Sequence, residues 1–347
     1  MSSRGRRLVI TLAALAGLCA ALPQADAHAA PSIWTRARNP AIERRVQLLG
    51  QAEALLLKYR ALQIRGRREV VMGRLYLGEA LKVLEEGGAA TSRDPILRFR
   101  LAEVHFELTN WTKAAPLYES VLRSRVSAPM RQRAYSELAL CYARLDRHDD
   151  EIRAYTEALA LQPIPSARAT LLANRAEAYM YKGDLTSAIE GYRAALLLHT
   201  PGQLVSYAAT TLWGLAVALD RSGDLEAGFA SIQLARTYDK FDKQLSSGSW
   251  FYVPEYDVHW YKALGHWSSA RATDLGAVRA EEIGRAVTAW EEFIENARPD
   301  DPWLPLARAR LKMCVKERDR ALEKARSASK PRPAPKGELE PLPFDVP

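Results

Sequence analysis

The stretch that decides the fold is "AYSELALCYARLDRHDDEIRAYTEALALQP", residues 134–163. In its first half, large and small residues recur at the spacing of one helix face, and the second half repeats such a pattern before a closing proline. The stretch therefore predicts two helices that pack against each other. The residues that carry the pattern are Tyr135, Leu138, Ala139, Tyr142, Tyr155, Ala158 and Pro163.

The same pattern recurs along the chain. It is clear in "LLANRAEAYMYKGDLTSAIEGYRAALLLHTP", residues 171–201, and weaker in residues 97–122 and 210–236. The equivalent alanines, Ala102, Ala139, Ala176 and Ala216, are 37, 37 and 40 residues apart. Small residues at these places let two helix backbones approach closely. A single helix pair cannot bury both faces, so such pairs stack into a solenoid.

These residues resemble the tetratricopeptide repeat, a helix–turn–helix unit of about 34 residues. The spacing here is slightly longer than that of the family. The resemblance implies an all-α solenoid of helix–turn–helix repeats, wound as a right-handed superhelix. The positions that match the repeat motif are Ala102, Ala114, Ala139, Tyr142, Ala176, Tyr179, Ala188, Tyr192 and Ala216.

We divide the chain into five segments on this basis. Residues 30–94 are expected to form a degenerate N-terminal helix pair, and residues 95–240 four repeats. Residues 241–328 are expected to form a degenerate repeat and a capping helix. Residues 329–347 are Pro-rich and are expected to be a disordered tail. Residues 1–29 have the pattern of a signal peptide.

The N-terminal segment predicts export from a bacterial cytoplasm. Three arginines precede the apolar run of residues 8–22, which is short for a membrane span. Ala27-His28-Ala29 matches a signal-peptidase site, and Ala25-Asp26-Ala27 is an alternative. We therefore expect a periplasmic protein, either free or associated with a membrane complex. No second apolar run approaches membrane length.

The composition adds few constraints. The net charge of +8 falls to about +6 when residues 1–29, which carry +2, are removed. The basic residues are spread along the helices, and nucleic acid is not an expected partner of an exported protein. Cys141 and Cys314 lie far apart in helical patterns, and we expect two buried thiols rather than a disulfide.

The sequence has no recognisable catalytic or metal-binding motif. It lacks the H-E-x-x-H, C-x-x-C, G-x-S-x-G and phosphate-loop patterns. His259 and His266 are seven residues apart, about 10 Å along a helix, too far to share a metal ion. The acidic group "RHDDE", residues 147–151, is interpreted as a solvated helix start. We expect no enzymatic activity, no metal and no cofactor.

In the resembled family, the first helix of each pair lines a groove that binds peptides or partner helices. Carried over to this sequence, that implies a mixed-charge groove with scattered aromatic side chains. The implied groove residues are Phe99, Glu103, Glu107, Ser136, Leu140, Arg144, Glu177, Tyr181, Trp213, Val217 and Arg221. The sequence therefore favours a non-enzymatic scaffold for other envelope proteins or peptides, supporting assembly of a secretion, motility or wall-building machine.

The ring-rich stretch "GSWFYVPEYDVHWYKALGHW", residues 248–267, leaves two alternatives open. Its rings recur at helical spacing, which favours a core helix paired with the helix that contains Trp290. Alternatively, Trp250, Phe251 and Trp267 form an exposed platform that binds peptidoglycan or exported polysaccharide. The tail motif "LPFDVP", residues 342–347, is a further candidate for docking on a partner.

Overall fold

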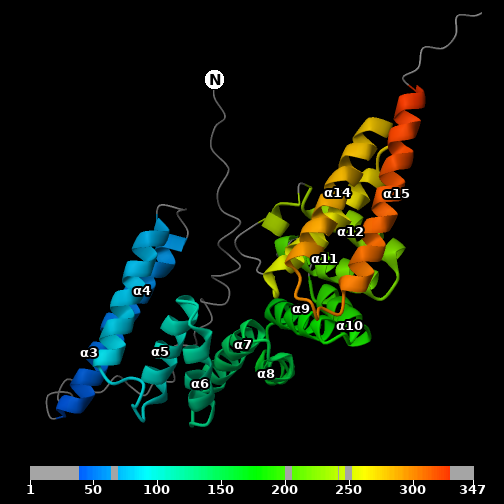
Figure 1. Cartoon of the computed structure of the whole chain (residues 1–347). Coiled ribbons are helices and arrows are strands. Elements are labelled where there is room, and N and C mark those ends of the chain that lie inside the picture. The colour runs from blue at the N-terminus through cyan, green and yellow to red at the C-terminus, as the bar shows by residue number, and fades with distance from the viewer. Residues whose placement is uncertain (1–38, 64–68, 200–204, 241, 247–251, 329–347) are drawn as a thin grey trace, which may run out of the picture. The chain divides into compact units, whose positions relative to one another are not determined.

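The computed structural model describes residues 39–63, 69–199, 205–240, 242–246 and 252–328 (Figure 1). These residues form α-helices and two short 3₁₀ segments, and no strand occurs among them. The predicted all-α class is therefore confirmed. The chain divides into two compact units that meet between Val253 and Pro254. The expected signal peptide and tail, together with Trp250 and Phe251, lie outside the described residues.

The first unit is a series of helix pairs. Consecutive helices pack on each other, and each pair also packs on the next. We call the odd-numbered helices first helices and the even-numbered ones second helices. Their bounds are α3 (Pro40–Gln63) and α4 (Glu69–Glu86), α5 (Pro95–Glu107) and α6 (Trp111–Leu122), α7 (Ala128–Arg144) and α8 (His148–Leu161), α9 (Pro165–Tyr181) and α10 (Leu185–Leu197), and α11 (Val205–Arg221) and α12 (Leu225–Tyr238), followed by η1 (Lys243–Ser246).

The described part of the second unit contains three α-helices. A short 3₁₀ segment, η2 (Glu255–Asp257), leads into α13 (Val258–Arg271). Then come α14 (Gly276–Asn296) and α15 (Leu304–Ala328). α14 packs against both α13 and α15. The helix pair expected from the ring-rich stretch and Trp290 is thus α13 with α14.

The turns inside the repeats share one backbone geometry. Thr109, Asp146, Gly183 and Gly223 all have positive φ, between 59° and 97°. Each lies seven residues after one of the equivalent alanines, so the left-handed conformation recurs with the repeat. In the third and fourth repeats the next residue is an N-cap: Asp184 and Asp224 each accept a backbone N–H three residues on. Each such turn reverses the chain and starts the second helix.

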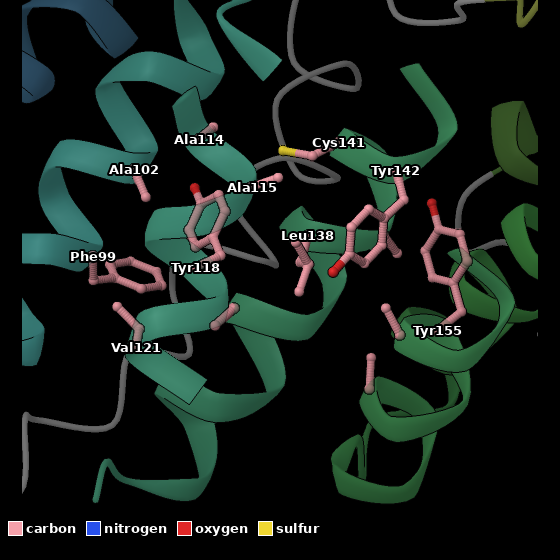
Figure 2. Packing of buried hydrophobic residues seen from close by; sticks show 14 of the residues in the cluster. Phe99, Ala102, Ala114, Ala115, Tyr118, Val121, Leu138, Cys141, Tyr142 and Tyr155 are labelled. Atoms are coloured by element: carbon pink, nitrogen blue, oxygen red, sulfur yellow. The ribbon is translucent and has the colours of Figure 1, made fainter. Parts of the chain in front are cut away.

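The core of the first unit combines small residues with large rings (Figure 2). Tyr118 is fully buried, and its ring meets that of Phe99 edge-on at 5.7 Å between centroids. Ala102 and Ala114 lie in the same cluster and are fully buried. Burial of one such ring contributes about 1.5–3 kcal/mol of hydrophobic stabilisation.

The repeat-defining residues occupy the places that the motif implies. Ala102, Ala114, Ala139, Tyr142, Ala176, Ala188, Tyr192 and Ala216 are buried, and Tyr179 is partly buried. A Cβ on Gly191 would lie only 2.9 Å from the Cβ of Ala176, so α9 and α10 touch almost backbone to backbone. The small-residue pattern therefore marks helix–helix contacts.

Because Thr109 is a β-branched residue at a φ of 60°, replacing it with glycine should stabilise the protein. We expect Thr109→Gly to raise the free energy of unfolding by about 0.5–1 kcal/mol. The left-handed conformation costs a residue with a side chain about 1–2 kcal/mol, and the larger conformational entropy that glycine gives to the unfolded chain cancels part of this gain. Gly183→Ala, at the equivalent turn, should lower it by a similar amount. Urea unfolding followed by circular dichroism measures both. If both substitutions changed the free energy of unfolding in the same direction, the shared turn geometry would be contradicted.

Candidate protein-binding surface

The carboxylate of Glu103 joins three first helices. Glu103 lies on α5 and is 1% exposed. It pairs with Arg60 of α3 and with Arg133 of α7. Arg100, one turn earlier on α5, donates to Glu103 Oε2 at 2.8 Å and pairs with Glu53 of α3 at 2.7 Å. We call this set the Glu103 cluster; its members are Glu53, Arg60, Arg100, Glu103, Arg133 and Glu137.

Arg133 links the cluster to the hydrophobic core. Its Nε donates to Glu137 Oε1 at 2.6 Å, and its guanidinium lies 5.3 Å from the centre of the Phe99 ring. The hydroxyl of Tyr118 donates to Glu137. Each charge of this cluster therefore has a partner on another element, as buried charges require.

The charges around Glu103 decide its protonation. Burial alone would raise the pKa of this carboxyl, but Arg133, Arg100 and Arg60 outweigh burial and hold the pKa below its ordinary value. Glu107, one turn further along α5, differs: burial raises its pKa, and the hydrogen bond from Tyr59 at 2.8 Å only partly offsets this. Glu103 is thus a stable anion.

A narrow hollow lies further along the first helices. The space left in it is about 10 Å³, no more than one water molecule needs. It brings together three predicted groove residues from α7 and α9 with six residues that the groove prediction did not include. Its lining is Leu140, Ala143, His148, Glu151, Tyr155, Asn174, Glu177, Tyr181 and Val253. The side chain of Val253 thus contributes to this surface within the first unit.

His148 is the central polar group of the hollow. Its ring stacks on Tyr181, with centroids 5.5 Å apart, and its nitrogens lie 2.9 Å from Glu151 Oε2 and 3.0 Å from Asp146 Oδ1. Burial lowers the pKa of His148, but the hydrogen bonds and charges of Glu151 and Asp146 outweigh it, so the pKa is raised. The interpretation of residues 147–151 as a solvated helix start is wrong for Glu151, which is 4% exposed.

Five of the eleven predicted groove residues are buried. Phe99 packs on Tyr118, and Glu103 is enclosed by arginines, so neither presents a surface to a partner. Every residue from 211 to 221 on α11 is buried. The groove prediction is therefore wrong for five residues: Phe99, Glu103, Trp213, Val217 and Arg221.

The other six predicted residues are partly exposed. Ser136, Leu140 and Arg144 follow each other at four-residue spacing on α7, so they form one row along the helix. The Arg144 guanidinium lies 5.8 Å from the centre of the Trp111 ring. Glu107, Glu177 and Tyr181 are also partly exposed, on α5 and α9. We call these six residues the first-helix row.

The ring-rich stretch forms core in its described part. Trp260 is fully buried and meets Trp290 edge-on at 4.8 Å, which confirms the core interpretation of these rings. Trp267 is 2% exposed, and its Nε1 donates to Glu317 Oε2 of α15 at 2.7 Å. The alternative in which Trp267 belongs to an exposed platform is therefore wrong, because the indole is buried and its N–H donates to a residue of α15.

Neither a cluster of metal ligands nor a helix able to cross a membrane occurs in the described part of the chain. In it, no three histidines, cysteines or carboxylates come together in a way that could hold a metal ion. No described helix combines the length and the apolar character that a membrane crossing needs. Cys141 and Cys314 are free and buried, as expected.

Substituting Glu103 should weaken the fold in a pH-dependent way. Glu103→Gln removes the anion that Arg60, Arg100 and Arg133 share. Breaking a fully buried pair costs roughly 3–5 kcal/mol, and the loss is smaller here because the arginines are partly exposed and Glu53 and Glu137 remain. Since the folded pKa is lowered from 4.5, the stabilisation is present above pH 4.5 and is lost as pH falls below it. The difference between wild type and variant should shrink in acid.

Urea unfolding at a series of pH values measures this difference. Glu157→Gln on the exposed face of α8 is the matched control and should cost almost nothing at any pH. A difference for Glu103→Gln that stays constant from pH 7 to pH 3 would contradict the assignment.

Substituting Trp267 should test whether it is core. We expect Trp267→Ala to lower the free energy of unfolding by about 3–5 kcal/mol. Trp267→Phe keeps a ring but loses the bond to Glu317, and should cost less. Thermal unfolding by circular dichroism measures both. An unchanged melting temperature for Trp267→Ala would mean that the indole is a surface group.

Comparisons with known proteins agree with this arrangement. A family model for the tetratricopeptide repeat matches residues 99–164 and 174–242. A comparison with curated proteins finds no match. The crystal structure of MamA shares 16% identity over 51% of this chain and 95% of that chain, with a TM-score of 0.42.

Two further solved structures are similar to parts of this chain. A Podospora anserina kinesin light chain with nearly identical TPR-like repeats has 16% identity, covers 57% of this chain and 97% of that one, and has a TM-score of 0.45. The Cut9–Hcn1 hetero-tetramer of APC/C has 15% identity over 79% of this chain and 48% of that chain, with a TM-score of 0.43. Residues 99–164 and 174–242 of this chain are therefore assigned to tetratricopeptide repeats.

Proposed function

We propose that this protein is a non-enzymatic scaffold of the bacterial cell envelope, on which other proteins assemble into a secretion, motility or wall-building machine. The observation that carries the proposal is the first-helix row beside the hollow. Partly exposed polar, charged and aromatic side chains from successive first helices lie there on a scaffold of packed helix pairs. Such a surface suits a peptide or a partner helix.

The row is held in place by the buried charges next to it. The Glu103 cluster joins α3, α5 and α7, and the stacking of His148 on Tyr181 joins the start of α8 to the end of α9. Side chains on a rigid support lose little freedom when a partner binds, which favours affinity. The expected location in the envelope is supported by the pattern of residues 1–29.

Site-specific photo-crosslinking in living cells tests the proposal. A photoreactive residue replaces Ser136 or Arg144 of the row, and Glu190 or Leu197 on the exposed side of α10 as matched controls. We expect the row positions to capture a small, shared set of envelope proteins that the control positions do not capture. Mass spectrometry of the purified protein should also find an N-terminus near residue 30.

Two outcomes would count against the proposal. Identical adducts from the row and from α10, or none from either, would remove the row as the binding surface. Co-sedimentation with purified cell wall, unchanged by substitutions in the row, would favour the glycan-binding alternative. In that alternative Trp267 cannot serve as an exposed binding ring, because its side chain is buried.

A further inference from the structure

The helix α15 carries a row of five cations on its exposed side. Arg308, Lys312, Lys316, Arg320 and Lys324 are each four residues apart and are all exposed. None of the five forms an ion pair with another described residue, whereas Arg318 nearby pairs with Asp319. We call them the basic row. Five solvated, unpaired cations in a line attract an anionic partner.

Two hollows lie along the basic row, both within the second unit. One, of about 610 Å³, is bordered by Arg308 and Lys312 at one end and by Arg320 at the other, with Leu311 and Val315 between them. Asp319 and Glu323 also line it. All of these residues belong to α15, so this hollow is a shallow, open depression along one helix.

The second hollow, of about 530 Å³, lies between α14 and α15. Trp267, Met313 and Ala321 form its apolar part, and Lys316, Arg320 and Lys324 border it; Gly276, Arg279, Asp274 and Glu317 complete the lining. Glu317 accepts hydrogen bonds from Trp267 at 2.7 Å and from Arg279 at 2.9 Å, and the charge of Arg279 balances the negative charge of Glu317. Both hollows thus combine apolar contacts with an excess of positive charge.

This chemistry fits an acidic peptide with apolar side chains better than a membrane. A helix that lies on a bilayer needs a broad apolar face. The exposed side of α15 offers only two exposed large apolar side chains among its described residues, Met313 and Leu322. The separate carboxylates and apolar side chains of a peptide match the cations that alternate with Leu311, Val315 and Met313 along the row.

The chain itself contains such a peptide. Residues 337–347, "GELEPLPFDVP", alternate carboxylates with apolar residues. They lie outside the described residues. Lys316 precedes Ala328 by about 18 Å along the helix, and residues 329–336 can span about 26 Å, so the peptide can reach the row. The complementary residues are Glu338, Glu340 and Asp345, with Leu339, Leu342 and Phe344.

We propose that the acidic segment 337–347 binds in the same chain to the basic row of α15, with its carboxylates on the cations and its apolar side chains in the two hollows. A partner of similar chemistry then has to displace this segment before it can use the row. The proposal is independent of the first-helix row, which belongs to the other unit.

Disulfide trapping in the full-length protein tests the proposal. Cysteines replace Met313, which is 45% exposed at the second hollow, and Phe344. The matched control pairs Phe344→Cys with Leu197→Cys on α10, where Leu197 is 87% exposed. The intramolecular bond should form about tenfold faster for the first pair, because docking raises the local concentration. Raising the salt concentration should slow it.

Charge reversal separates a specific contact from chance encounters. Lys316→Glu with Arg320→Glu should slow trapping severalfold, and Glu338→Lys with Glu340→Lys in the same protein should restore it. Arg125→Glu with Arg193→Glu, exposed on the other unit, should have no effect. Equal rates for the two cysteine pairs, no effect of charge reversal, or disulfides only between two molecules would each overturn the proposal.

Discussion

The close approach of paired helices is the constraint on which the repeats depend. A Cβ on Gly228 would lie 3.0 Å from the carbonyl oxygen of Ala216, as close as Gly191 lies to Ala176. At these places only a small side chain fits, and large rings fill the space one turn away, as Tyr192 does against Gly214. The helix pairs therefore repeat along the chain with the same spacing as the small residues at their contacts.

Each second helix from α4 to α10 packs between two first helices, and first helices of neighbouring pairs also contact one another. In the first half of the unit they do so through charge, at Glu103, Arg60 and Arg133. In the second half they do so through apolar contact, since α11 is buried from residue 211 to 221. A partner therefore finds accessible side chains mainly between these regions, on α7 and α9. The location of the candidate site thus follows from the burial of the first-helix side chains at both ends of the unit.

The helix pairs could be predicted because their signal is local. Ala139 and Tyr142 lie three residues apart, and Ala102, Ala176 and Ala216 repeat the small residue at a regular distance. The burial of Glu103 could not be predicted from the sequence. Its partners Arg60 and Arg133 are separated by more than seventy residues and belong to different helix pairs.

Other errors had a local signal that the prediction missed. The run "LWGLAVAL", residues 212–219, is apolar on every side of its helix, which indicates a buried helix and not one that lines a groove. His148 and Glu151 are three residues apart on one helix face, so their pairing was also accessible from the sequence. The burial of Trp267 depends on Glu317, fifty residues away, and had no such signal.

The two described cysteines have a consequence for measuring how the protein opens. Cys141 is fully buried in the first unit and Cys314 in the second. Burial, together with the charge of Glu137, raises the pKa of Cys141 to about 12, so its thiol reacts with an alkylating reagent only after local unfolding. When the third cysteine of the sequence, Cys19, is replaced by serine, labelling of the two thiols, resolved by mass spectrometry, reports the opening of each unit separately. The chain thus carries one built-in stability probe in each half.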